Sequence, residues 1–183
     1  LGMTQEDVFL GMFTSFSHPH ELFHRTLNLG ASSVLLDSWN PRIIARAIQT
    51  HKVTWMMAVP SLYEMMLRRD PIGSDISSLR VMEAGGAYVS AQSLEAYEAH
   101  FGVDFIPVWG STETVGVAIA LEPGASRPDG ALGRPCPGYA FEVVGEDDEI
   151  LEAEEVGELV VRGPGVVDGY LGAQVDGAAR RLT

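Results

Sequence analysis

The sequence has one cysteine, Cys136, and few basic residues. A single cysteine excludes an internal disulfide, and with no CxxC pair a reducing cytoplasm is the simplest expected compartment. Only 12 lysines and arginines stand against 25 acidic residues, which gives a net charge of −13 and a pI near 4.6. General affinity for nucleic acid or for an anionic membrane requires a positive surface, so we expect neither as a partner.

Long hydrophobic runs are also missing. The longest apolar stretches, such as residues 53–59, are too short to span a bilayer, and residues 1–7 lack the basic start and apolar stretch of a signal peptide. The 183 residues include 46% hydrophobic residues, which is ordinary for a globular protein, and a chain of this length can bury a core. We therefore expect a folded, acidic protein without a transmembrane segment.

Short apolar runs alternate with helical patterns over the first two-thirds of the chain. Asn40 followed by Pro41, Pro60 followed by Ser61, and Ser90 each provide a helix start. Four runs are predicted as strands, the first of them buried: residues 31–36, 53–59, 79–84 and 104–109. Alternation at this spacing predicts an α/β fold with a mainly parallel sheet flanked by helices.

The composition changes near residue 122. A glycine- and proline-rich stretch follows, and beyond it residues 139–144 and 157–162 alternate in the manner of strands. We expect an α/β subdomain at 1–122, a β-rich, partial-barrel subdomain at 123–171, and a truncated tail at 172–183. The acidic tract between the two alternating runs is interpreted as a solvated loop rather than a cation site.

Two loops follow predicted strands, where parallel sheets bind their ligands. The first is Gly85-Gly86-Ala87, and the second begins at Gly110. Gly110 permits close approach of a ligand to the backbone. Trp109 before it could stack on a planar base.

The next three residues of the second loop carry groups suited to phosphate. Ser111 and Thr112 can donate hydrogen bonds to phosphate oxygens, and Glu113 offers a hard anionic oxygen suited to Mg²⁺. The alternative is a strand-to-helix loop in which Thr112 merely caps the next turn. The residue types by themselves leave both interpretations open.

The hexapeptide WGSTET at 109–114 is similar to the YGxTE signature of adenylate-forming enzymes, a family that includes acyl-CoA synthetases, aryl-CoA ligases, luciferases and adenylation domains of peptide synthetases. Other segments resemble the family's motifs in the same order: 53–61 its VT…VP(T/S) segment, 83–87 its GGAP loop with Tyr88 where proline is usual, 130–135 its GxxGxP turn, and 157–171 its GEL…GYL segment. The resemblance covers nearly the whole chain.

The resemblance implies roles for individual residues. Thr112 would contact the α-phosphate of ATP, Glu113 the Mg²⁺, and Trp109 would take the place of the tyrosine beside adenine. His18 would border the acyl pocket and the thiol tunnel. The remaining residues implied to bind the cofactor are Gly85, Gly86, Ala87, Gly110 and Ser111.

The family's chemistry is attack of a carboxylate on the α-phosphorus of ATP, which gives acyl-AMP and pyrophosphate, followed by displacement of AMP by a thiol, usually that of coenzyme A. The implied partners are therefore a carboxylic acid, ATP, Mg²⁺ and coenzyme A. Relatives that activate amino acids place an aspartate in the loop matching residues 13–18, where this sequence has none. A fatty, aryl or other simple acid is expected instead.

His18, His20 and His24 also have a spacing that could bind a metal, although no carboxylate or cysteine obviously completes such a site. Packing or helix capping is another interpretation of His18, beside the role implied by the resemblance.

The family's glycine-rich phosphate loop, its TGD segment and its domain with the catalytic lysine are missing from the sequence. We therefore expect the central piece of a larger enzyme, inactive in isolation. A non-catalytic module that keeps the fold and binds a nucleotide or acyl group is the alternative. An unrelated Rossmann-type oxidoreductase is disfavoured, because no GxGxxG follows the first predicted strand.

Overall fold

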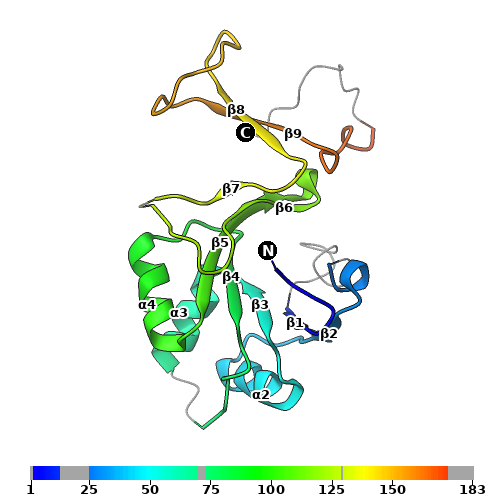
Figure 1. Ribbon diagram of the computed structural model, residues 1–183, viewed down its shortest axis with the longest axis vertical. Coiled ribbons are helices and arrows are strands. Elements are labelled where there is room, and N and C mark those ends of the chain that lie inside the picture. The colour runs from blue at the N-terminus through cyan, green and yellow to red at the C-terminus, as the bar shows by residue number, and fades with distance from the viewer. Residues whose placement is uncertain (1, 13–24, 70–72, 129, 173–183) are drawn as a thin grey trace.

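The computed structural model describes residues 2–12, 25–69, 73–128 and 130–172 (Figure 1). Two sheets are present in these ranges: a seven-stranded sheet with the order β2-β1-β3-β4-β5-β6-β7, and a two-stranded sheet of β8 and β9. The strands are β1 Val8–Gly11, β2 Ser32–Leu35, β3 Trp55–Ala58, β4 Val81–Ala84, β5 Asp104–Ser111, β6 Gly116–Ala120, β7 Arg134–Pro135, β8 Ala140–Val144 and β9 Glu158–Arg162. The labelled helices are α2 Pro41–His51, α3 Pro60–Arg69, α4 Ala91–Phe101 and the short 3-10 helix η1 Thr112–Thr114, and residues 25–29 are helical as well.

The large sheet is parallel from β2 through β5 and antiparallel from β5 through β7. Helices α2, α3 and α4 pack on one face of it, through side chains such as Ile48, Tyr63 and Tyr97 that share a core with one face of the strands. The opposite face has its own apolar cluster around Phe9, Trp55 and Val108. The predicted α/β class with a mainly parallel sheet and flanking helices is confirmed.

The helix starts follow the predicted capping residues. The side chain of Asn40 accepts a hydrogen bond from the backbone N–H of Arg42 at 3.0 Å, and the Ser90 hydroxyl accepts one from Ser93 N at 3.0 Å. Each bond satisfies a first-turn donor that has no partner within the helix. These caps are confirmed.

Two strands differ from the prediction. Strand β1 was not among the predicted strands; it lies in the sheet interior between β2 and β3 and is largely buried. The expected burial of the first predicted strand is wrong, since β2 is the edge of the sheet and Leu35 is 63% exposed. A short apolar run shows that a strand can form, but its position in the sheet depends on its partners.

A buried ion pair lies on the sheet face opposite the three long helices. Glu83 of β4 is fully buried, and its Oε1 accepts hydrogen bonds from Arg25 Nη1 at 2.6 Å and from Trp55 Nε1 at 2.7 Å. Arg25, in the helical residues 25–29, also lies over the ring of Phe9. The pair therefore attaches this segment to the sheet directly before the Gly85 loop.

The two-stranded sheet lies at one end of the molecule, beyond β6 and β7 (Figure 1). Strands β8 and β9 pair antiparallel, with Ala140 opposite Arg162, and the acidic tract that joins them is largely exposed. The subdomain division at residues 122 and 123 stays a prediction. Among the helices that the structure describes, none combines the length and hydrophobicity needed to cross a membrane.

Candidate functional site

The two predicted loops leave neighbouring parallel strands at the same edge of the sheet. Strand β4 pairs with β5 so that Ala84 lies opposite Pro107, and the Gly85 loop begins immediately after it. Strand β5 continues four residues further, to Ser111, before it turns. The carboxyl edge of β4 and β5 thus carries both loops, the position at which open α/β sheets bind ligands.

The double-glycine loop has a packed residue and an open one. Gly85 is buried, and a Cβ there would lie 2.7 Å from Cγ2 of Val108 on β5, so the loop closes tightly against the neighbouring strand. Gly86 has φ +76°, a conformation in which side chains are disfavoured. Gly86, Ala87 and Tyr88 are exposed, which leaves their backbone groups accessible to a ligand.

Gly110 is required by a close approach of protein backbone. The β5–β6 register shifts between Trp109 and Gly110, and a Cβ at Gly110 would lie 1.9 Å from the carbonyl oxygen of Gly116. From the sequence, this glycine was predicted to permit the approach of a ligand. The structure supplies a different neighbour, the backbone of the adjacent strand.

Gly110→Ala is therefore expected to lower the free energy of unfolding by about 2–3 kcal/mol, because β6 must move to admit the methyl group. Urea denaturation of the ligand-free protein measures this change. Gly102→Ala is the matched control: Gly102 has φ +66° but no atom within 4 Å of its Cβ position, so about 1 kcal/mol is expected. Equal losses in the two variants would contradict the assigned contact.

Trp109 packs against the two-stranded sheet. Its ring is half-buried and meets Phe141 of β8 edge-on, with ring centroids 6.0 Å apart and an interplanar angle of 75°. Such edge-to-face contacts are favourable for aromatic pairs. Phe141, which follows β7 in the sequence, thus positions one side of Trp109, the residue predicted to lie beside adenine.

The segment after β5 is a turn between antiparallel strands, so the alternative of a strand-to-helix loop capped by Thr112 is wrong. A single 3-10 turn, η1, leads directly into β6. The side-chain hydrogen bonds within this turn are made by Thr114. Its buried hydroxyl accepts a hydrogen bond from Ser111 N at 2.9 Å and donates one to Gly116 O at 2.8 Å. The Thr112 side chain is exposed.

Glu113 is half-buried, and its carboxylate accepts a short hydrogen bond from the hydroxyl of Tyr170. This bond is the largest cause that lowers the pKa of Glu113 below its usual value, and it raises the pKa of Tyr170. The carboxylate is therefore ionised at neutral pH. Within the described ranges no group of three or more His, Cys, Asp or Glu could hold a metal ion, but a single carboxylate suits Mg²⁺ that arrives with substrate phosphates.

His18, and with it His20 and His24, lies outside the residues that the structure describes. Tyr139 and Tyr170, which were not among the predicted site residues, contact the turn from positions far along the chain. Two sequence signals could have indicated such contacts: the GEL…GYL segment, which includes Tyr170, and the glycines of 163–165, which pack around Tyr139.

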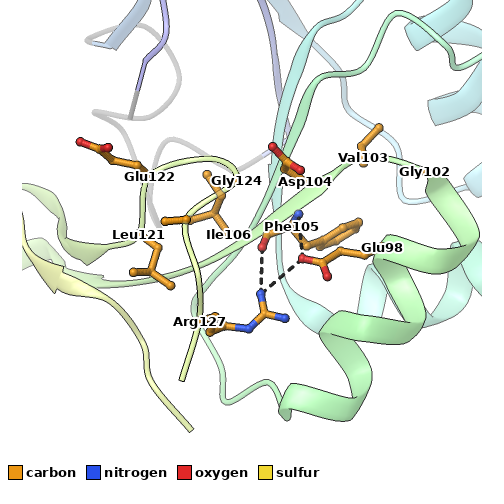
Figure 2. Close-up of a pocket in the computed structure, with 11 residues that line it drawn as sticks. Glu98, Gly102, Val103, Asp104, Phe105, Ile106, Leu121, Glu122, Gly124 and Arg127 are labelled. Carbon is orange, nitrogen blue, oxygen red and sulfur yellow. Dashed lines mark hydrogen bonds and ion pairs between the residues drawn. The ribbon is translucent and has the colours of Figure 1, made fainter. Parts of the chain in front are cut away.

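A cavity of about 390 Å³ lies at the opposite edge of the sheet, where β5 begins (Figure 2). Arg127 crosses it and donates to Glu98 Oε1 at 3.3 Å and to the carbonyl oxygen of Phe105 at 3.2 Å. These polar groups bind one another and attach the segment after β6 to α4. The cavity is separate from the two loops described above.

A family model described as AMP-binding enzyme matches residues 1–171. The chain belongs to this family. Indoleacetate–CoA ligase of Aromatoleum aromaticum is 33% identical over 146 residues, covering 79% of this chain and 28% of that protein. Anthranilate–CoA ligase of Pseudomonas aeruginosa is 32% identical over 171 residues, covering 92% of this chain and 32% of that protein.

Solved structures agree with the family match. The anthranilate CoA ligase AuaEII in complex with anthranoyl-AMP has a TM-score of 0.87 and 26% identity, covering 94% of this chain and 34% of that one. The resemblance to adenylate-forming enzymes is thereby confirmed. The chain spans about a third of the length of the curated relatives that it matches.

Proposed function

We propose that the chain is the central part of an ATP-dependent acid–CoA ligase. The reaction joins a carboxylate to the α-phosphorus of ATP, giving acyl-AMP and pyrophosphate, and the thiol of coenzyme A then displaces AMP. The observation that carries the proposal is the accessible turn with Thr112 and the ionised Glu113 at the carboxyl edge of β5, next in the sheet to the strand that bears Gly85 and Gly86. The CoA-ligase relatives and the acyl-adenylate bound by AuaEII support it.

The roles follow from the chemistry of a reaction between two anions. Glu113 would hold Mg²⁺ that arrives with ATP, and the ion would offset the negative charge of the phosphates. Thr112 would donate its hydroxyl to the α-phosphate, where charge develops. The exposed backbone of Gly86 and Ala87 would line the adenine and acyl pockets.

The remaining predicted residues act around this centre. Trp109, held by Phe141, would lie beside the adenine, while Gly110 and Ser111 would give the turn its shape. His18 is proposed to border the acyl pocket and the thiol tunnel.

The proposed substrate is an aryl, fatty or other simple carboxylic acid. We propose fatty acid metabolism as one process in which the reaction takes part, and the cytoplasm as the compartment. Two of the relatives act on indoleacetate and anthranilate by name, so aromatic acids are the first to try, with sulfoacetate, named for a third, as a small aliphatic acid beside them. The rest of the ligase, with its phosphate loop and catalytic lysine, is proposed to belong to the same polypeptide. A non-catalytic nucleotide- or acyl-binding module is the alternative function.

Carboxylate-dependent ATP–pyrophosphate exchange tests the proposal. The intact protein that contains this chain is expected to catalyse the exchange with at least one acid of an aromatic and aliphatic panel, and only with Mg²⁺ present. The 183-residue chain alone is expected to show none, because the phosphate loop and the lysine are missing from it. Nucleotide binding by the intact protein without exchange for any acid would favour the non-catalytic module, and robust exchange by the short chain would refute its predicted inactivity.

A further inference from the structure

The turn with Thr112 and Glu113 is held by residues that follow β7. The backbone N–H of Val167 donates to the carbonyl oxygen of Glu113 at 2.9 Å. The hydroxyl of Tyr139 donates to the carbonyl oxygen of Thr114 at 2.5 Å. Two consecutive carbonyl groups of the turn are thus bound by partners outside it.

Tyr139 reaches the turn through a notch made by two glycines. A Cβ at Gly165 would lie 2.1 Å from the Tyr139 hydroxyl oxygen and 3.1 Å from Thr114 O. A Cβ at Gly163 would lie 2.7 Å from Cδ1 of the same ring. A tyrosine hydroxyl is protonated at neutral pH and can donate, and burial raises the pKa of Tyr139 further. The segment 163–165 is therefore shaped to admit this ring and to aim its hydroxyl at the turn.

The backbone of the turn needs such support. Val115 has φ +51°, a left-handed conformation that is unfavourable for a β-branched residue. A strained residue of this kind persists only where its surroundings fix the conformation. The hydroxyl of Tyr139 binds the residue immediately before Val115.

We propose that Tyr139 is a positioning residue of the candidate site, which through the carbonyl group of Thr114 holds Thr112 and Glu113 where they meet the phosphates and their metal ion. The inference rests on the proposed function. Because catalytic groups act best when they are held in place before the substrate binds, loosening the turn weakens metal-dependent catalysis without removing a metal ligand.

Tyr139→Phe removes the hydroxyl and keeps the ring. Tyr97→Phe is the matched control, because the buried Tyr97 hydroxyl donates to the carbonyl oxygen of Pro60 at 3.2 Å, away from the turn. Amide hydrogen exchange of Ser111 and Val115, whose N–H groups bond within the turn, is expected to rise about fivefold in Tyr139→Phe and to stay unchanged in Tyr97→Phe.

Kinetics on the intact protein separate positioning from simple stability. The Mg²⁺ concentration that gives half-maximal ATP–pyrophosphate exchange is expected to rise about fivefold in Tyr139→Phe and to stay at the wild-type value in Tyr97→Phe. Gly165→Ala, which intrudes on the same hydroxyl, should shift it in the same direction. This second variant tests the contact with the hydroxyl still present.

Unchanged amide exchange in Tyr139→Phe would overturn the inference, and so would faster exchange with an unchanged Mg²⁺ requirement, since the bond would then be merely structural. Both results leave the wild-type activity intact and thus spare the proposed function. Absence of exchange activity in the wild-type intact protein with every acid would instead overturn the proposed function, and the positioning role with it.

Discussion

Replacement of Glu113 by glutamine is expected to lower carboxylate-dependent ATP–pyrophosphate exchange of the intact protein by about a hundredfold or more. The amide keeps the size of the side chain and can still accept the hydrogen bond from Tyr170. It lacks the negative charge that would hold Mg²⁺ against the phosphates. Initial rates of exchange at saturating ATP, over a range of Mg²⁺ concentrations, measure the effect.

Glu122→Gln is the control for this variant. Glu122 is an exposed glutamate that lines the cavity at the opposite edge of the sheet, so the substitution removes the same charge from the protein far from the turn. Its exchange rate should equal that of the wild type. If Glu113→Gln retained full activity with an unaltered Mg²⁺ requirement, Glu113 would not be the metal ligand.

Arg25→Leu is expected to lower the free energy of unfolding by about 3–5 kcal/mol, because it leaves the buried carboxylate of Glu83 without its cation. Trp55 Nε1 would remain as the donor to Oε1, while Oε2 is already buried without a hydrogen-bond partner among the described residues. The cation–π contact with Phe9 is lost as well. Urea denaturation of the ligand-free protein measures the change.

Arg68→Leu is the matched control, because Arg68 forms a pair with Glu64 whose side chains are 77% and 48% exposed. Exposed pairs of this type contribute less than about 1 kcal/mol. A double variant, Arg25→Leu with Glu83→Gln, should recover part of the stability lost in Arg25→Leu, since the amide removes the unpaired buried charge while its oxygen can still accept the hydrogen bond from Trp55 Nε1. A loss below about 1 kcal/mol in Arg25→Leu would show that the pair is not buried as described.

Much of the local structure could be predicted because it depends on neighbouring residues. The caps at Asn40 and Ser90 are bonds to residues two and three positions away. Strands β3, β4 and β5 were recognisable as apolar runs because central parallel strands are buried on both faces. Strand β1 was missed although it is as long as β3 and β4, and its place in the sheet comes from pairing with β2 and β3, which lie far along the chain.

The candidate site also has parts that the sequence predicts and parts that it does not. The types and order of residues 109–114, together with the other motifs, were enough to predict the family and to nominate Thr112 and Glu113. The glycine at position 110 was explained by the approach of a ligand, because the local sequence does not show that β6 approaches it. Assigning such a neighbour requires the pairing of β5 with β6.

The amino-acid sequence by itself determined the α/β class, the helix starts and the chemical groups of the proposed adenylation turn, since each of these depends on residue type or on spacing over a few positions. Only the tertiary structure decided that β2 is an edge strand, that Arg25 neutralises Glu83, and that Tyr139 and Tyr170 bind the turn. These two tyrosines lie 25 and 57 positions from the residues that they contact. Contacts at such separations form only when the sheets have assembled, and the local sequence does not identify the residues that make them.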